Sequence, residues 1–504
     1  MEASAQAADG AEFESPEGRW ILAAAVLGSG MAFLDGTVVN IALPSIGEDF
    51  NASTSALQWI SNGYLLTLAS LILLGGSLGD RMGRRRIFVI GVGLFTAASL
   101  LCAIAPTEEF LIGARLLQGI GGALLTPGSL AMIEASFVPG DRSRAIGAWS
   151  GLAGVSTALG PLLGGYLIEA ISWRAIFLIN LPLGLLVVAI SNRHVPESRD
   201  PDATGKLDIA GSVLAGLGLA GTTYALIEGP NGMSAAIVIA ALGGAAALVG
   251  FIWNEHRSPN PMMPLQMFSS RQFSAANLVT FVVYAALSGV FFLLVAFLQI
   301  TLGYSPIAAG AASLPVTALM LVFSARSGAF AHRVGPRIPL TVGPLVIAVG
   351  LLMLAQIDSG DEYVSSILPG VLVFGIGLTL VVAPVTATVL AAADMRHSGI
   401  ASGINNAVSR VGGLLAVAVL PLVAGLTGDS FYDPVAMEDG FQISMYVCAG
   451  LAALGGVIAF LTIRTDVLED EPGPADEHEH ERHYSCDVCG SGLRPGRESA
   501  RAEA

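Results

Sequence analysis

Long apolar segments alternate with short polar ones along nearly the whole chain. A membrane-spanning helix needs about 20 mainly apolar residues, and fourteen segments of the sequence meet that requirement. Little of the chain lies outside these segments except short loops and two polar tails. The pattern predicts spanning helices at residues 20–43, 57–79, 87–105, 110–134, 144–168, 173–191, 207–227, 234–254, 273–299, 307–330, 338–356, 365–392, 399–425 and 442–463.

The composition agrees with a protein embedded in a bilayer. The 504 residues are 53% hydrophobic and 12% charged, whereas a soluble globular domain carries about 25% charged residues. The first apolar segment begins at Trp20 and has no small-residue cleavage site, so we expect an anchor and not a removable signal peptide. These features exclude a soluble enzyme, and the lack of a basic footprint excludes a nucleic-acid partner.

Positive charges indicate the orientation, because Lys and Arg are retained in loops on the cytoplasmic side. If the N-terminus is cytoplasmic, the basic loops, for example those with Arg81 and Arg142, all fall inside. The outer loops are acidic instead, as around Glu108. We therefore expect a multi-pass protein of the cell membrane with both tails, residues 1–19 and 464–504, in the cytoplasm.

A short motif occurs twice in the chain. GSLGDRMGRR at residues 76–85 ends the second predicted helix, and GAFAHRVGPR at residues 328–337 ends the tenth. The shared spacing Gly-x-x-x-x-Arg-x-Gly predicts two related six-helix bundles, residues 20–191 and 272–463, with an inserted pair of helices in residues 192–271. Chance similarity between two basic loops is the alternative.

Four further motifs follow one another along the first half of the chain. LDGTVVNIALP at residues 34–44 lies in the first predicted helix, RLLQGIG at 115–121 in the fourth, GPLLGG at 160–165 in the fifth and WRAIFLINLPLG at 173–184 in the sixth. Together with the repeated motif, they resemble the major facilitator superfamily, in particular its fourteen-helix drug:proton antiporter branch, over about residues 18–463. Ala175 departs from the pattern, because that branch usually has an aromatic residue there.

The resemblance implies an all-α integral membrane protein with two six-helix bundles and two inserted helices. It also implies proton-coupled export of lipophilic small molecules, such as drugs, antibiotics or secondary metabolites, by alternating access. We expect no cofactor, and we expect a monomer whose partners are the substrate, protons and the lipid bilayer. Proton-coupled uptake of a small metabolite is the closest alternative. A membrane enzyme or a sensor would need a polar cluster or an output domain that the sequence does not offer.

Two of the motifs are candidates for conformational switching. Small residues in 160–165 allow close helix packing, and the proline there bends the helix; ordinary packing is the alternative. The charges in 76–85 can hold the cytoplasmic face closed through ion pairs; a loop that only sets the topology is the alternative. The predicted gating residues are Gly76, Asp80, Arg81, Gly83, Arg84, Arg85, Gly160, Pro161, Gly164, Gly165 and Arg333.

Asp35 is the main acidic residue well inside a predicted span. A charge at the bilayer centre costs about 3 kcal/mol, so the carboxyl group needs a partner or a water-filled cavity. Arg115 lies at a comparable depth, since both residues are about 9–13 Å from the outer ends of their helices at 1.5 Å per residue. We hypothesise that Asp35 binds the coupling proton and that Arg115 modulates its proton affinity. A static ion pair that only joins two helices is the alternative.

The substrate cavity is expected between the two bundles. Few polar side chains of the predicted spans there are charged, and Arg410 could either bind an anionic substrate group or pair with a backbone carbonyl. Lipophilic neutral or weakly anionic compounds therefore fit better than multivalent cations. The predicted cavity residues are Trp59, Asn62, Tyr64, Gln118, Gln299, Asn405, Asn406 and Arg410.

The C-terminal tail contains a possible metal site. His480, His483, Cys486 and Cys489 could supply four tetrahedral zinc ligands. No second pair of ligands follows, so the pattern is not a complete zinc-finger motif. A flexible, solvated tail with no part in transport is the alternative.

Overall fold

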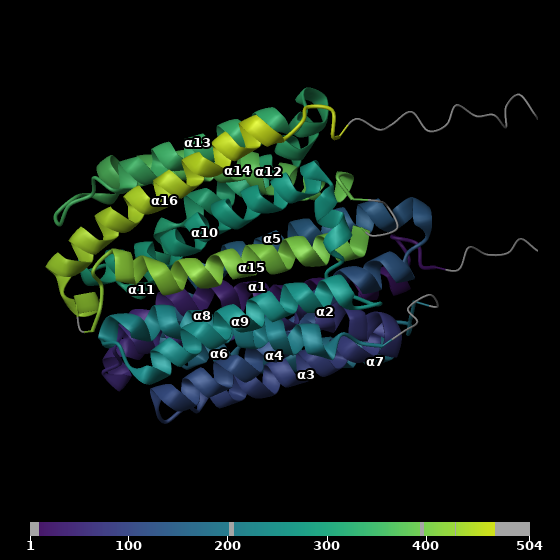
Figure 1. Cartoon of the computed structure of the whole chain (residues 1–504), viewed down its shortest axis with the longest axis horizontal. Helices are drawn as coiled ribbons and strands as arrows, with labels where there is room; N and C mark the ends of the chain where they lie inside the picture. The colour runs from purple at the N-terminus through teal and green to yellow at the C-terminus, as the bar shows by residue number, and fades with distance from the viewer. Residues whose placement is uncertain (1–9, 201–205, 394–397, 429, 469–504) are drawn as a thin grey trace, which may run out of the picture.

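The computed structural model describes residues 10–200, 206–393, 398–428 and 430–468, and these form helices joined by short loops (Figure 1). Residues 10–200 form seven of them. They are α1 (Pro16–Phe50), α2 (Thr54–Met82), α3 (Arg84–Ala103), α4 (Glu108–Ser136), α5 (Pro139–Ala170), α6 (Ala175–Leu178) and α7 (Asn180–His194).

An inserted pair and a second set of helices follow. The pair is α8 (Ile209–Glu228), with the short η1 (Gly229–Asn231), and α9 (Ala235–Arg257). The second set comprises η2 (Leu265–Ser269), α10 (Arg271–Ile300), α11 (Pro306–Ala312), α12 (Leu314–Val334), α13 (Arg337–Leu354), η3 (Tyr363–Ile367), α14 (Leu368–Ala391), α15 (Ser398–Val423), η5 (Ser430–Tyr432) and α16 (Pro434–Thr462).

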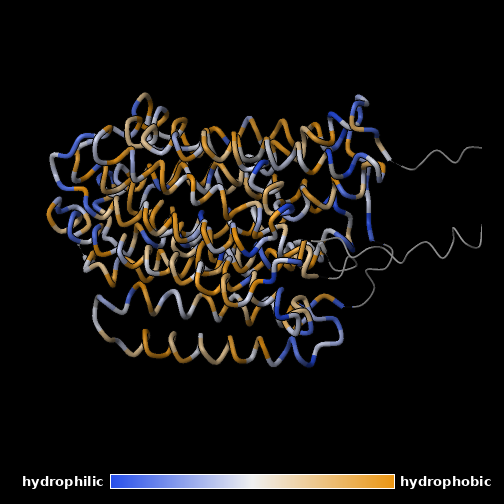
Figure 2. The backbone as a smooth tube through the Cα atoms, turned by 90° about the horizontal axis from the view of Figure 1, so that it is seen from above, coloured by the Kyte–Doolittle hydropathy of each residue, from blue (hydrophilic) through white to orange (hydrophobic). Residues whose placement is uncertain are grey.

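Each of the predicted spans overlaps one helix or two consecutive ones. Thirteen helical segments of the described chain are long and apolar enough to cross a membrane. The predicted span 144–168 lies in α5, whose 32 residues extend for about 48 Å, more than the roughly 30 Å of a bilayer core. An even number of crossings also agrees with Figure 1, where α1 begins and α16 ends at the same end of the molecule. Figure 2 shows polar residues gathered at the two ends and apolar residues between them.

Local sequence sets the helix ends, which differ from the predicted boundaries. The predicted first span, 20–43, lies inside a longer α1, because the Ser15 side chain accepts a hydrogen bond from the Gly18 amide and Pro16 fits the first turn. Pro44 does not end α1, since the helix continues to Phe50. The last span begins at Pro434, eight residues before the predicted start, because Asp433 caps α16.

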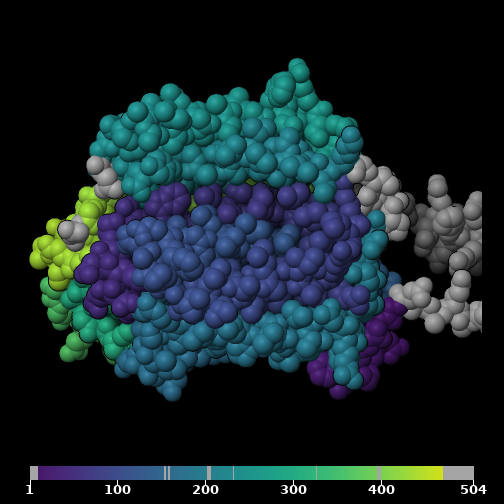
Figure 3. Space-filling view, turned by 90° about the horizontal axis from the view of Figure 1, so that it is seen from below, coloured from purple at the N-terminus to yellow at the C-terminus, as the bar shows by residue number. Residues whose placement is uncertain are grey.

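The helices pack as two bundles and a side pair. In the first bundle, α4 packs against both α2 and α3, α1 packs against α5, and α7 packs against α3. In the second bundle, α10 packs against α15 and α16, and α14 packs against α12 and α13. The pair α8–α9 packs together and contacts α2 and α15 through α8. Figures 2 and 3 show this pair along one side of the body, as expected for an insertion between bundles.

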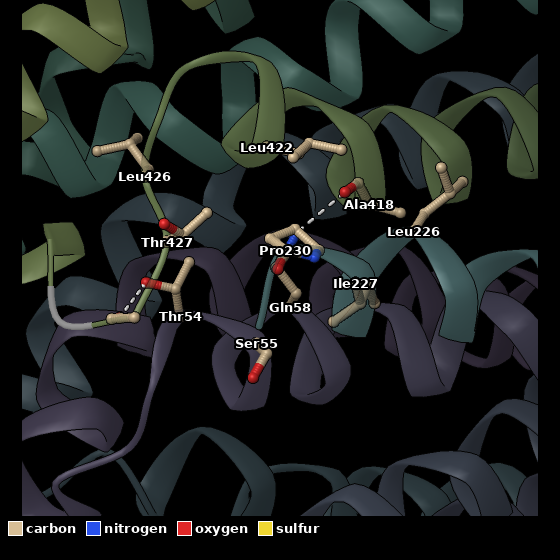
Figure 4. A pocket seen from close by; sticks show the side chains of 11 residues that line it. Thr54, Ser55, Gln58, Leu226, Ile227, Pro230, Ala418, Leu422, Leu426 and Thr427 are labelled. Carbon is tan, nitrogen blue, oxygen red and sulfur yellow. Dashed lines mark hydrogen bonds between the residues drawn. The ribbon is translucent and has the colours of Figure 1, made fainter. Parts of the chain in front are cut away.

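Hydrogen bonds join the two bundles at the end where α1 stops and α2 begins. Thr54 Oγ1 donates to Gly428 O at 2.7 Å, and Gln58 Nε2 donates to Ala418 O at 3.2 Å (Figure 4). Gln58 Nε2 also donates to Val417 O at 2.8 Å. Gln299 Nε2 donates to Ile41 O at 3.0 Å. Because Pro421 has no N–H to offer the carbonyl four residues earlier, the Gln58 amide satisfies an acceptor that α15 leaves open.

Candidate functional site

A buried polar cluster lies in the middle of the first bundle. Arg115 Nη1 on α4 donates to Asp35 Oδ2 on α1 at 2.5 Å, and it also contacts Gln118 Oε1 at 2.6 Å. Gln118 Nε2 donates to Asp35 Oδ1 at 2.7 Å. Both oxygens of the carboxylate therefore accept a hydrogen bond from α4. The Asp35 and Arg115 side chains are 0% and 2% exposed, respectively.

Neighbouring helices hold the Arg115 side chain in place. Its Nε donates to Ile60 O on α2 at 3.1 Å, and its guanidinium lies 4.6 Å from the centre of the Tyr64 ring. These contacts satisfy a cation that would be costly to bury alone. The pairing agrees with the similar depth inferred from the sequence, whereas the role of the pair in proton coupling stays a prediction.

Two polar residues that sequence reasoning missed extend the cluster towards α3 and α7. Ser99 Oγ donates to Phe177 O at 2.9 Å and accepts from Asn180 Nδ2 at 3.0 Å. Gln118 Nε2 lies 3.4 Å from the same hydroxyl. Asn180 belongs to the 173–184 motif, which was an available signal, but nothing in the sequence marks Ser99.

The GPLLGG motif of α5 lies between α1 and the second bundle. A Cβ atom at Gly160 would overlap Thr37 Oγ1, and one at Gly164 would lie 3.1 Å from Val38 Cβ, both on α1. On the other side of α5, a Cβ atom at Gly165 would lie 2.5 Å from Pro306 O, where α11 begins. The Pro161 carbonyl packs directly on Gly310 of α11. Only glycine permits this approach, so the motif is part of the contact between the bundles.

The GDRMGRR segment lies at the opposite end of α2 and binds the chain that follows α7. Arg84 Nη2 pairs with Asp80 Oδ1 at 2.9 Å, and Arg85 Nη1 donates to Val195 O at 3.0 Å. Glu197 accepts hydrogen bonds from the Arg85 and Arg86 amides at the first turn of α3. Gly83 has φ +116° and permits the turn between α2 and α3.

The remaining gating candidates lie in different surroundings. Gly76 faces the Pro127 ring on α4, with an ideal Cβ 3.6 Å from Pro127 Cβ. Arg81 lies at the end of α2, and Arg333 is exposed at the end of α12. Their proposed role in switching stays a prediction.

The predicted cavity residues of the first bundle do not gather on one open surface. Trp59 Nε1 donates to Glu228 Oε1 on α8 at 2.9 Å, so it joins α2 to the inserted pair. Tyr64 packs under Arg115, and Gln118 belongs to the Asp35 cluster. Asn62 is fully buried, and its side-chain amide has no hydrogen-bond partner in the described part of the chain.

The predicted cavity residues of the second bundle lie closer to the boundary between the bundles. Gln299 contributes to the inter-bundle contact with Ile41. Asn405 Nδ2 donates to Thr280 Oγ1 at 2.8 Å and joins α15 to α10. Asn406 and Arg410 are half-buried on the same helix.

The possible metal ligands of the tail lie outside the described residues. This applies to His480, His483, Cys486 and Cys489. The described part of the chain holds no group of three or more His, Cys, Asp or Glu that could bind a metal ion. A cavity of about 470 Å³ lies elsewhere, among the ends of α10, α13 and α16, and is lined in part by Arg271 and Arg337.

Comparison with known proteins identifies the family to which the chain is similar. A family model described as Major Facilitator Superfamily matches residues 25–417, which include the Asp35 cluster, the α5 motif and Arg410. A solved structure of a bacterial homologue of the human lysosomal transporter Spinster, in an inward-facing and unoccupied conformation, shares the fold with a TM-score of 0.64 at 17% identity. That likeness covers 90% of this chain and 98% of the other chain.

Two curated relatives are similar over most of their length. The methylenomycin A resistance protein of Streptomyces coelicolor is 37% identical over 470 residues, which cover 91% of this chain and 95% of the relative. The tetracenomycin C resistance and export protein of Streptomyces glaucescens is 36% identical over 416 residues, covering 82% of this chain and 77% of the relative. Both relatives are named as resistance proteins, and the second is also named as an export protein.

Proposed function

The chain belongs to the major facilitator superfamily, and from this we propose that it is a proton-coupled antiporter that exports lipophilic small molecules by alternating access. Relatives named for resistance, one of them also for export, support the direction of transport. The GPLLGG motif, which resembles that of antiporters, favours export over proton-coupled uptake. The protein would lie in the cell membrane with both termini in the cytoplasm and would move its substrate without altering it chemically.

Asp35 would carry the coupling proton. Its carboxylate is the only buried acidic group in the described part of the chain that forms an ion pair with a fully buried arginine. Arg115 and Gln118 donate to both of its oxygens, so a proton on either oxygen would replace one of these hydrogen bonds. Protonation would therefore weaken the attachment of α1 to α4. This contact is the observation that carries the proposal.

A continuous set of contacts connects Asp35 to the boundary between the bundles. Thr37 and Val38 follow Asp35 on α1 and pack against Gly160 and Gly164 of α5. The opposite face of α5 packs against α11 through Gly165. A movement of α1 that follows protonation would thus be transmitted to the interface that must open.

The state of the transporter follows from the same interface. Hydrogen bonds and glycine contacts join the bundles at the end that is extracellular in the proposed orientation. We infer that this structure corresponds to the outward-closed state, in which substrate enters from the cytoplasm. The alternating cycle would then require these contacts to break.

The decisive experiment is substrate-dependent proton flux in proteoliposomes with a trapped pH-sensitive dye. Resistance screening of a strain that lacks the gene would supply the substrate. Wild-type protein should show proton movement opposite to substrate movement, and Asp35→Asn should lose this flux while still exchanging substrate across the membrane. Normal proton-driven transport by Asp35→Asn would refute the assignment.

Asp49→Asn is the matched control, because Asp49 is also an acidic residue of α1. Its carboxylate lies at the rim, where it accepts hydrogen bonds from Arg174 and Trp173. This variant should retain proton coupling. The direction of substrate movement in vesicles of known orientation separates export from uptake.

A further inference from the structure

Arg410 is a cation near the middle of the membrane. It lies twelve residues after Ser398, the first residue of the 26-residue α15, or about 18 Å along the helix. Helix α15 contacts both bundles, since it packs against α10 on one side and α2 on the other. Arg410 therefore lies at the boundary where a substrate cavity of this fold would form.

Two other arginines, Arg115 and Arg326, lie well inside predicted spans, and both have partners. Arg115 binds Asp35, Gln118 and Ile60 O. Arg326 Nη1 donates to Val322 O of its own helix at 2.8 Å. A charged side chain at the bilayer centre is costly, and these contacts offset that cost.

Arg410 differs from both. Its Nε atom is buried and has no hydrogen-bond partner among the described residues, and the ion pairs in that part of the chain all involve other arginines. The two alternatives drawn from the sequence were a backbone carbonyl and an anionic substrate. A carbonyl partner is not found within the described structure, so the second alternative gains support.

The surroundings of Arg410 favour a ligand with one negative charge. Tyr64 of α2 and Tyr284 of α10 lie within electrostatic range of Arg410. Tyr64 is buried under Arg115, whereas Tyr284 is partly exposed and offers aromatic surface. Asp35, whose charge acts on the same Tyr64 side chain, is already compensated by Arg115. The ionised side chains of Asp35, Arg115 and Arg410 together carry one positive charge. A ligand with one negative charge would neutralise it.

We propose that Arg410 binds the anionic group of the transported compound, so that the substrates are lipophilic aromatic monoanions. This inference rests on the proposed export function for its place in the transport cycle. It has a consequence for energetics, because inward movement of a proton and outward movement of a monoanion both carry positive charge inward. Export would then be driven by the membrane potential as well as by the pH difference.

Two probes that differ only in charge test the assignment. 1-Anilinonaphthalene-8-sulfonate carries one negative charge, and N-phenyl-1-naphthylamine has the same ring system without the sulfonate. Binding of each to the full-length protein in lipid nanodiscs is measured by fluorescence titration. Wild type should bind the sulfonate more tightly, and Arg410→Gln should weaken sulfonate binding about tenfold or more, as for loss of one desolvated charge contact, without changing the neutral probe.

Three further variants make the result specific. Arg410→Lys keeps the charge and should retain most of the sulfonate preference, which also shows that the site tolerates substitution. Arg326→Gln removes an intramembrane arginine that already has a carbonyl partner and should bind both probes as wild type does. Asp35→Asn should still bind the sulfonate, so a failure of proton coupling is distinguishable from a failure of this proposal. Equal binding of both probes by wild type, no binding of the sulfonate, or unchanged sulfonate affinity in Arg410→Gln would overturn it.

Discussion

Asp35 and Arg115 form an ion pair across α1 and α4 in which the Nη1–Oδ2 distance is 2.5 Å and both side chains are almost completely buried. A pair of this kind makes the two helices depend on each other. Removing one partner leaves an uncompensated charge without water, whereas removing both leaves a neutral gap. The stability of variants can therefore separate the structural contribution of the pair from its proposed part in transport.

Arg115→Gln should lower thermal stability strongly, because it leaves the Asp35 carboxylate buried and unpaired. The expected cost is about 3–5 kcal/mol. The double variant Asp35→Asn/Arg115→Gln should recover most of this loss but remain unable to couple transport to protons. The fraction of monodisperse protein after heating in detergent measures the first effect and proton flux measures the second. If the double variant is no more stable than Arg115→Gln, the pair is not the source of the loss.

The architecture was predictable because bilayer thickness imposes a length on every span. Each predicted span overlaps a helix, and Lys and Arg patterning requires an even number of crossings, in agreement with the shared location of the described chain ends. Exact ends were not predictable from hydropathy. Helix α16 begins at Pro434 because Asp433 caps it, so the helix includes the polar residues Glu438 and Asp439. These charged residues lie at the rim and therefore do not count toward the apolar span.

The site was predictable only in part. Residue counts along two helices are enough to predict that Asp35 and Arg115 lie at comparable depth, although α1 extends beyond Pro44, from which the count was made. Rotation about the helix axis is not fixed by the same counts. This explains why Gln118, expected in the substrate cavity, bonds to Asp35 in this structure, and why Trp59 bonds to Glu228 of the inserted pair.

Gly165→Ala should shift the transporter away from the outward-closed state. The new methyl group would lie 2.5 Å from Pro306 O and 2.6 Å from Ile307 Cα, so α5 and α11 must separate. Spin labels at two exposed rim positions, Ile104 and Val435, report the separation of the bundles at that end. We expect a longer distance between the labels in a larger fraction of molecules.

Gly151→Ala is the control for this substitution. Gly151 also lies in α5, but an added Cβ would meet nothing within 4 Å. The distance distribution should remain that of wild type. An unchanged distribution in Gly165→Ala as well would show that the motif does not limit opening.

Gln58→Leu tests the hydrogen bonds across the same boundary. Leucine fills a similar volume but cannot donate to Val417 O, the carbonyl that Pro421 leaves without its helical partner. A buried acceptor left unsatisfied costs about 1–3 kcal/mol, which corresponds to a shift of roughly 5- to 150-fold in the ratio of closed to open molecules. The label pair at Ile104 and Val435 should again report opening. Ser55→Ala, which alters a neighbouring side chain in the same contact region (Figure 4), should have no effect, and a closed population equal to that of wild type in Gln58→Leu would contradict this account.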